Sequence, residues 1–220
     1  MGKVVVFNPA PAPQLSSPAG RVVITGGLGS LGLLLAGWLS RQHARCRIQL
    51  LGRSGRADGG AGTAGPLESL LGGAQGMVEV CKADVSLAAD CAAVFGAHAS
   101  DCGSPVLAVL HAGGVLADSV LRNQTASAAR RVFAPKLAQL GRWAGAVGLQ
   151  PCGGVGSSGC AHVLFSSVAS LLGSPGQANY AAANAGLDAA ATALSSAGLG
   201  FVSVQWGAWA GGGMAAADSQ

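Results

Sequence analysis

Between residues 167 and 184 the chain carries a hydroxyl, a phenol and an amide that could act together on one substrate oxygen. Ser167 follows an apolar run, 161–165, that is typical of a buried strand. Tyr180 and Asn184 are four residues apart at the start of an Ala-rich segment, so on a helix they share one face. A phenol can give a proton to an oxygen that a hydroxyl polarises. The spacing therefore predicts a proton-transfer site at a strand end.

A glycine-rich loop upstream has the form of a dinucleotide-binding turn. The motif Gly27-x-Gly29-x-x-Gly32 follows a β-branched run, 21–25, that is typical of a strand buried on both faces, and it opens a helix-like segment, 33–41. Glycines allow the backbone to approach a pyrophosphate, and a helix N-terminus offers unpaired N–H groups. We predict a cofactor site here; the alternative is a glycine-rich turn that binds nothing.

The end of the second predicted strand indicates which cofactor is bound. A unit that binds NAD usually has Asp or Glu at this point, which binds the ribose 2′-hydroxyl. This chain has Arg53 and Ser54 instead. A guanidinium and a hydroxyl would bind a 2′-phosphate that a carboxylate would repel. We therefore predict NADPH rather than NADH; the alternative is an exposed loop arginine with no role.

Predicted strands and helices alternate along the chain and would position these groups. The predicted strands cover 21–25, 46–51, 77–81, 105–110, 161–165 and 199–204. The predicted helices cover 33–41, a short segment after the loop 58–65, 86–99, 124–143 and the Ala-rich segment near Tyr180. Ser86 could cap the third helix, and Pro135 should end or kink the fourth. The alternation predicts an α/β fold of Rossmann type, a doubly wound parallel sheet in three layers.

Composition excludes several classes of protein. The net charge of +4 is too weak and scattered to indicate nucleic-acid binding. No uncharged apolar run reaches the ~18 residues of a membrane span, and residues 1–7 are too short for a signal peptide. The six cysteines form no C-x-x-C pair and the histidines lack metal-ligand spacing, so we expect no metal and reduced thiols. Residues 150–159 have the composition of a disordered surface insertion.

Further motifs carry a family resemblance. They are the thirteen-residue spacing from Ser167 to Tyr180 and the stretches 25–32, 51–55, 82–86, 111–116, 133–136, 176–184 and 206–209. In combination they resemble the short-chain dehydrogenase/reductases, and within these the ketoreductase domain of a modular polyketide synthase or an animal-type fatty acid synthase. The resemblance implies a Pro/Ala/Ser-rich lead segment at 1–19, an NADPH-binding ketoreductase domain at 20–210 and a truncated start of the lid at 211–220. The lid and the last strand of the sheet are then expected to be missing.

The resemblance implies a role for each catalytic residue. Tyr180 would be the general acid, and Ser167 would hydrogen-bond the substrate carbonyl; the adjacent Ser166 would point to the opposite face of its strand. Most short-chain reductases have a lysine where this chain has Asn184, but in the synthase type a lysine from the preceding long helix serves, and Lys136 matches it. Because an unperturbed phenol ionises only near pH ~10, it needs a nearby cation. Lys136 would make the phenol more acidic, and Asn184 would hold the lysine or a relay water.

The resemblance also implies which residues contact the cofactor. They are Thr25, Gly26, Gly27, Leu28, Gly29, Ser30, Leu31, Gly32, Arg53, Ser54, Asp84, Val85, His111, Ala112 and Gly113. Asp84 and Val85 would flank the adenine, and the stretch 111–113 would line the ribose and nicotinamide. Leu116-Ala117-Asp118 matches the Leu-Asp-Asp motif of B-type ketoreductases at its first and last positions.

The implied function is NADPH-dependent reduction of a β-ketoacyl thioester to the β-hydroxyacyl thioester in polyketide or fatty acid synthesis. The implied partners are an acyl carrier protein, whose phosphopantetheine holds the substrate, and other synthase domains, in the cytoplasm and without a membrane or nucleic acid. Two alternatives remain open. One is a free-standing short-chain reductase of small ketones, against which Asn184 argues. The other is a non-catalytic or truncated fragment that binds cofactor at most.

Overall fold

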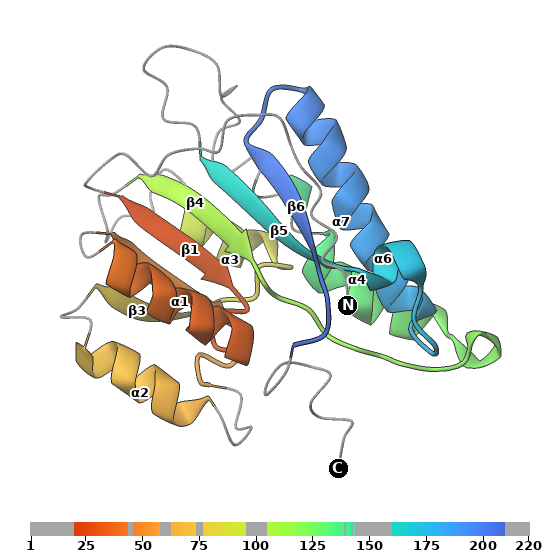
Figure 1. The fold of residues 1–220 in the computed structure, drawn as a ribbon, viewed down its shortest axis with the longest axis horizontal. Helices are drawn as coiled ribbons and strands as arrows, with labels where there is room; N and C mark the ends of the chain where they lie inside the picture. Colours follow the sequence, from red (N-terminus) through yellow and green to blue (C-terminus); the bar gives the residue numbers. More distant parts are fainter. Residues whose placement is uncertain are drawn as a thin grey trace.

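Six parallel strands form a single twisted sheet (Figure 1). The computed structural model describes residues 20–43, 46–57, 63–73, 77–95, 105–138, 140, 141, 143 and 160–209. The strands are β1 (Arg21–Thr25), β2 (Arg47–Gly52), β3 (Val78–Lys82), β4 (Val106–His111), β5 (Ala161–Ser167) and β6 (Phe201–Trp206). Their order, β3-β2-β1-β4-β5-β6, is that of a doubly wound dinucleotide-binding fold. The predicted Rossmann-type parallel sheet is confirmed.

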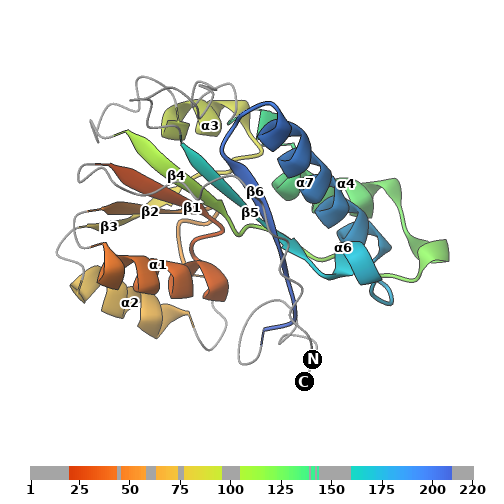
Figure 2. The same ribbon diagram turned by 45° about the horizontal axis from the view of Figure 1, so that its top comes forward.

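Helices cover both faces of the sheet, which gives the predicted three layers (Figure 2). The helices are α1 (Ser30–Gln42), α2 (Ala64–Gly73), α3 (Ala88–Phe95), α4 (Ala126–Lys136), α6 (Ala169–Leu172) and α7 (Ala178–Ser196), with a 3-10 turn η1 (Leu121–Asn123). Helices α1 and α2 pack on one face, and α3 and α7 pack on the other. Helix α4 lies against α7, so the last turn of α4 and the first turns of α7 are neighbours.

The long helix predicted over 124–143 is interrupted at its proline, as expected. Thr125 begins α4, because its side-chain oxygen accepts the backbone N–H of Ala128 at 3.1 Å. The helix ends at Lys136, directly after Pro135. Trp143 lies in a separate helical segment. The proline therefore fixes where the chain leaves α4 and places Lys136 in its last turn.

Two local features differ from the prediction. Helix α3 begins at Ala88, since the carboxylate of Asp84 accepts both the N–H and the hydroxyl of Ser86, at 2.9 and 2.6 Å, and holds them in a turn. The short helix α6 was not predicted; it forms in the loop after β5, where four residues give too little periodicity for a sequence signal.

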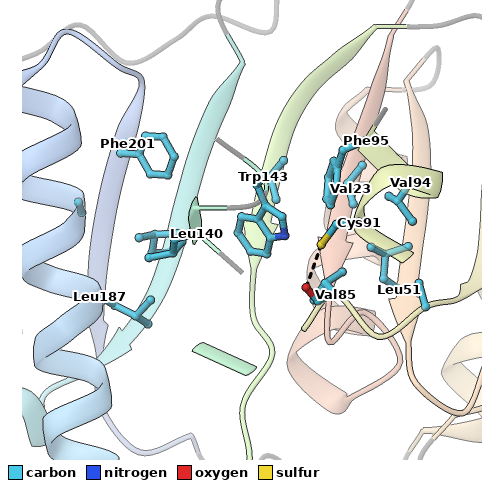
Figure 3. Packing of buried hydrophobic residues seen from close by; sticks show 14 residues of the cluster. Val23, Leu51, Val85, Cys91, Val94, Phe95, Leu140, Trp143, Leu187 and Phe201 are labelled. Atoms are coloured by element: carbon cyan, nitrogen blue, oxygen red, sulfur yellow. Dashed lines mark hydrogen bonds between the residues drawn. The ribbon is translucent and has the colours of Figure 1, made fainter. Parts of the chain in front are cut away.

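The face of the sheet toward α3 and α7 has a core organised around one tryptophan. Trp143 is fully buried, and in Figure 3 it lies between Leu140 on one side and the side chains of α3 on the other. Its ring contacts Phe95 at a centroid distance of 5.9 Å. In the same cluster the Cys91 thiol donates to the carbonyl of Val85 at 2.9 Å. Replacing a buried ring of this kind by alanine typically lowers the free energy of unfolding by about 3–5 kcal/mol. Trp143 therefore stabilises the packing of the segment after α4 against the sheet.

The sheet brings distant parts of the sequence to one edge. Because all six strands are parallel, their carboxyl ends lie together, and the connections leave β1 and β4 toward opposite faces. A crevice outside the carboxyl ends of two such strands is where ligands bind in open α/β sheets. The segments that the sequence singles out as functional follow a strand at this edge or begin a helix beside it, except Lys136, which ends α4.

Several predictions concern segments outside the described residues: the lead 1–19, the insertion 150–159 and the lid start 211–220. In the ranges that the structure does describe, no helix has both the length and the apolar character that a membrane crossing requires.

Candidate active site

The glycine-rich loop is packed too tightly to accept side chains at three of its glycines. A Cβ on Gly27 would lie 2.7 Å from the carbonyl oxygen of Ile24. Gly26 has a φ of +67°, and a Cβ there would lie 2.6 Å from the Cα of Gly113. A Cβ on Gly32 would lie 2.5 Å from the carbonyl oxygen of Gly26. The loop is therefore pressed between the first turn of α1 and the segment after β4. This is the close helix–strand packing that the motif predicts.

Gly29 differs from Gly26, Gly27 and Gly32 because the space beside its Cα is open. A Cβ there would meet only the carbonyl oxygen of Gly26, at 3.4 Å. Gly29 caps α1 without a side-chain hydrogen bond, and the first N–H that bonds back to it is that of Leu33. The N–H groups at the start of α1 thus lack intrahelical partners. This cradle fits a pyrophosphate, which would take those donors and the space at Gly29.

The ends of β2 and β3 present cationic side chains to solvent. Arg53 and Ser54 are exposed, and the Ser54 hydroxyl donates to the carbonyl of Arg56 at 2.9 Å. Lys82 is also exposed, and a Cβ on Gly55 would lie 3.0 Å from its Cβ. Arg56 and Lys82 thus add two positive charges near Arg53 that the cofactor prediction did not include.

Some predicted cofactor contacts can be made by backbone only. The side chains of Leu28 and Val85 are buried in the two cores. The Asp84 carboxylate is half-buried and is used in the turn with Ser86. At Leu28 and Val85 only the backbone can contact a cofactor, because the apolar side chains are buried in the core.

His111 requires a correction, because its ring is turned into the core and is not exposed at the site. The side chain is fully buried, its Nδ1 lies 2.5 Å from Oγ1 of Thr25, and its ring packs edge-on against Trp143 at 4.9 Å. Burial and the nearby charge of Lys136 lower the pKa of His111 to about 3, so the ring is neutral. Thr25 is buried with it. Within 111–113, His111 can therefore line a cofactor site only with its backbone, while Ala112 and Gly113 are partly exposed.

Lys136 brings a buried ammonium group to the start of α7. Its side chain is 2% exposed. Nζ donates to the carbonyl of Phe165 at 3.1 Å and lies 5.4 Å from the ring centroid of Tyr180. Burial lowers the pKa of Lys136 to about 8, against an opposing effect of Asp188. The amine is therefore shielded from bulk water and lies beside the ring of Tyr180, and its action on the phenol stays a prediction.

The two serines at the end of β5 face opposite ways, as strand alternation predicts. Ser166 is buried, and its hydroxyl donates to the backbone carbonyl of Asn184 at 3.3 Å. Ser167 is half-buried, and its Oγ accepts the N–H of Ala169 at 3.1 Å. Accepting this bond uses a lone pair of Ser167 and leaves its hydroxyl hydrogen for a ligand.

The start of α7 is hydrogen-bonded to the segment after β4. Asn179 is the link: its Oδ1 accepts the N–H of Tyr180 at 2.7 Å and its Nδ2 donates to the carbonyl of Ala117 at 2.8 Å. The side chain of Gln177 donates to Asp118 at 2.7 Å. These bonds fix where Tyr180 emerges, and they give Asp118 a structural partner.

Asn184 lies one turn after Tyr180 but is not seen to hold the lysine. Its Nδ2 donates to the backbone carbonyl of Tyr180 at 2.9 Å. Its Oδ1 is buried and has no hydrogen-bond partner among the residues that the structure describes. The hydrogen bond that the structure shows is thus within α7, because i and i+4 groups of a helix are neighbours. That Asn184 holds the lysine or a relay water stays a prediction.

Comparison with protein families decides to which group this site belongs. A model of the KR domain matches residues 20–211. The chain belongs to the ketoreductase domain family. Members of this family in polyketide synthases are nicotinamide-dependent reductases, so the site just described is that of a ketoreductase domain.

Individual relatives agree with the family. The chain is 40% identical over 215 residues to the polyketide synthase GfsB of Streptomyces halstedii, covering 96% of the chain and 4% of that protein. It is 39% identical over 218 residues to erythronolide synthase EryA3 of Saccharopolyspora erythraea, covering 97% and 6%. The chain thus spans less than a tenth of the length of these synthases.

Solved ketoreductase structures share the fold. The ketoreductase PlmKR1 from the first module of phoslactomycin biosynthesis in Streptomyces sp. HK803 gives a TM-score of 0.72 at 35% identity, covering 93% of this chain and 46% of that one. A ketoreductase domain from the bacillaene assembly line gives 0.72 at 29% identity, covering 90% and 46%. The chain therefore spans slightly under half of each structure.

The sequence analysis of this ketoreductase domain missed Asp188. It is eight residues after Tyr180 and four after Asn184, so the same helical spacing that selected Asn184 would also have selected it. Its carboxylate accepts hydrogen bonds from Ser170 and Ser203, each at 2.6 Å.

The glycine loop gives a paired prediction. Gly32→Ala should destabilise the domain by about 1–3 kcal/mol, because the new methyl overlaps backbone. Gly29→Ala should change the free energy of unfolding by less than about 0.5 kcal/mol but weaken binding of the nicotinamide cofactor, whose pyrophosphate needs that space. Urea unfolding without cofactor and calorimetric titration with it test both. Full cofactor affinity in Gly29→Ala would contradict the assignment of the cradle.

The burial of Lys136 gives a prediction on stability. Its folded pKa of about 8 lies below the ordinary 10.5, so between these values the unfolded chain binds more protons and stability rises with pH. Lys136→Met should therefore gain stability relative to wild type below pH 8, and this gain should shrink by on the order of 1–3 kcal/mol toward pH 10.5. Urea unfolding across this range measures it, with exposed Lys82→Met as the control. If the difference in unfolding free energy between Lys136→Met and wild type did not change with pH, Lys136 would be solvated in the folded protein.

Proposed function

We propose that this domain reduces a β-ketoacyl thioester to the β-hydroxyacyl thioester with NADPH, the acyl group being carried on the phosphopantetheine of an acyl carrier protein. The observation that carries the proposal is the shielded ammonium of Lys136, 5.4 Å from the ring centroid of Tyr180, beside the strand end that bears Ser167. A phenol next to a desolvated cation is suited to give up a proton.

Hydride and proton transfer together would complete the reduction. The nicotinamide cofactor supplies the hydride that the carbonyl carbon accepts. Tyr180 gives its phenolic proton to the carbonyl oxygen, so the ketone becomes a secondary alcohol. Ser167 donates its hydroxyl hydrogen to the same oxygen and stabilises the charge that develops there. Lys136 stabilises the phenolate left on Tyr180 until a proton returns from solvent.

The choice of NADPH is supported by charge at the ends of β2 and β3. Arg53 and Ser54 are exposed where a carboxylate would bind the 2′-hydroxyl of NADH. Arg56 and Lys82 are exposed nearby and add to the positive potential. A 2′-phosphate accepts charge-assisted hydrogen bonds from such groups.

The carrier-bound substrate is supported by the kind of protein in which the relatives of this domain occur. The relatives reported above are named as a polyketide synthase and an erythronolide synthase, and each is a far longer chain of which the matching region is a small part. A free-standing reductase of small ketones and a non-catalytic fragment are the competing functions. Turnover of an acetoacetyl carrier protein, compared with free acetone-sized ketones, separates the three.

Replacing the single tyrosine of the chain tests the proton donor. Tyr180→Phe removes only the hydroxyl, so NADPH should still bind, while oxidation of NADPH with an acetoacetyl thioester should fall by at least ~10²-fold. Absorbance at 340 nm measures turnover, and fluorescence of bound NADPH measures binding. Turnover near that of wild type would remove Tyr180 from the mechanism.

Replacing one arginine tests the cofactor. Arg53→Ala should raise the KM for NADPH by about 10–100-fold, as expected for the loss of a charge-assisted hydrogen bond, and leave the KM for NADH nearly unchanged. Arg47→Ala is the matched control, because Arg47 is exposed at the opposite end of the same strand. Equal effects of Arg53→Ala on both cofactors would show that no 2′-phosphate is bound there.

A further inference from the structure

Asp188 is held in one position by three different elements. It lies on α7, and its carboxylate accepts the hydroxyls of Ser203 on β6 and Ser170 on α6, each at 2.6 Å, and the side-chain amide of Gln205 at 2.8 Å. A lone surface carboxylate needs no such set of donors. The arrangement therefore fixes both the position and the orientation of the negative charge.

The strand β6 is polar where it faces this carboxylate. Phe201, Ser203 and Gln205 alternate along the strand, so they share the face that packs on α7. Phe201 belongs to the core, but the next two positions on that face are polar and both donate to Asp188. Polar groups in a half-buried sheet face are retained when they are hydrogen-bonded, and here the carboxylate provides that partner.

These bonds keep Asp188 ionised. Burial alone would raise the pKa of Asp188, but hydrogen bonds from Ser170, Ser203, Gln205 and Ser166 outweigh it and leave the pKa below its ordinary value. Asp188 is thus a fixed negative charge throughout the neutral and alkaline range.

The site contains a positive charge that needs such a partner. Lys136 is 2% exposed and donates to the carbonyl of Phe165, the residue before Ser166. Ser166 donates its hydroxyl to the backbone carbonyl of Asn184 on α7, and it pairs in the sheet with Gln205, whose side chain donates to Asp188. The lysine and the aspartate therefore lie beside neighbouring positions of β5, Lys136 at Phe165 and Asp188, through Gln205, at Ser166.

No other described charge competes for this role. His111, whose ring is set beside the backbone of Lys136, is neutral because burial lowers its pKa to about 3. The ring of Tyr180 faces the lysine from α7, and Phe165 offers only a carbonyl. Within the part of the chain that the structure describes, Asp188 is the acidic side chain whose charge acts on Lys136.

We propose that Asp188 is a positioning residue for the reduction: its fixed carboxylate is the counter-charge that keeps Lys136 cationic beside Tyr180. This inference rests on the proposed function for its catalytic meaning, but the charge coupling itself can be measured without substrate. Tyr180, Asn184 and Asp188 then form one stripe of α7, in which the first gives the proton and the third sustains the cation that makes this possible.

The direct test is a titration of Lys136 by NMR. The chain has only three lysines, Lys3, Lys82 and Lys136, so a protein labelled with ¹³C at the lysine Cε gives three signals, and Lys136→Met assigns the third. In Asp188→Asn the titration midpoint of Lys136 should move to lower pH, because the neutral amide no longer favours the ammonium. Ser203→Ala, which removes one hydrogen bond but keeps the charge, should leave the midpoint near that of wild type.

Two further variants of Asp188 keep the test valid if Asp188→Asn does not fold. If Asp188→Asn does not give native circular dichroism, Asp188→Ser removes the same charge with a smaller side chain, and Asp188→Glu should restore the midpoint toward wild type. In the active enzyme, the alkaline limb of kcat/KM should move to lower pH in the neutral variant, a change that a merely structural role would not produce.

The outcomes separate this inference from the proposed function. A folded neutral variant with an unchanged Lys136 midpoint, in an enzyme that reduces acetoacetyl carrier protein, would overturn the role of Asp188 and leave the reduction intact. A shifted midpoint in a protein that reduces no ketoacyl substrate would overturn the reduction and leave only a charge pair.

Discussion

The structure depends on an amine held out of water. The ammonium of Lys136 is 2% exposed, with one carbonyl partner and an aromatic ring beside it. Burial lowers its pKa, and the charge of Asp188 opposes that effect. Removing a cation from water is costly, and a domain of this size would gain stability from an apolar residue at this point. In a site with little water, however, that charge acts on a neighbouring phenol far more strongly than it would in solvent. In the function that we propose, this loss of stability at Lys136 serves proton transfer from Tyr180.

The fold assembles this arrangement from elements that are far apart in the chain. Pro135 ends α4 one residue before the amine leaves the helix, and Trp143 fastens the next segment to the sheet. The parallel strands then bring β5, with Phe165 and Ser167, to the same edge as the glycine loop. His111 connects β1 with the segment after α4, since it bonds to Thr25 and packs on Trp143. Its side chain, which was expected at the cofactor surface, thus stabilises the core below that surface.

Much of the fold could be predicted because its signals are local. Strands buried on both faces are continuous apolar runs, and all six were placed within two residues of their ends. Strand β5 extends to Ser167, two residues past its apolar run, since backbone pairing with β6 continues beyond the hydrophobic side chains. The helix α6 could not be predicted, because its four residues are held by the end of β5 and by contact with α7, not by their own propensity.

The sequence by itself determined the sheet, the glycine loop and the candidates Ser167 and Tyr180, because strand periodicity, turn chemistry and short spacings involve residues that are near one another in the chain. Lys136 was a candidate through the family resemblance. Only the tertiary structure decided which of these groups are solvated. It turned His111 inward, aimed the amide of Asn184 at its own helix and set Asp188 against Ser203 of a different strand. Burial and charge depend on the groups that pack against a side chain, and those neighbours come from distant parts of the chain.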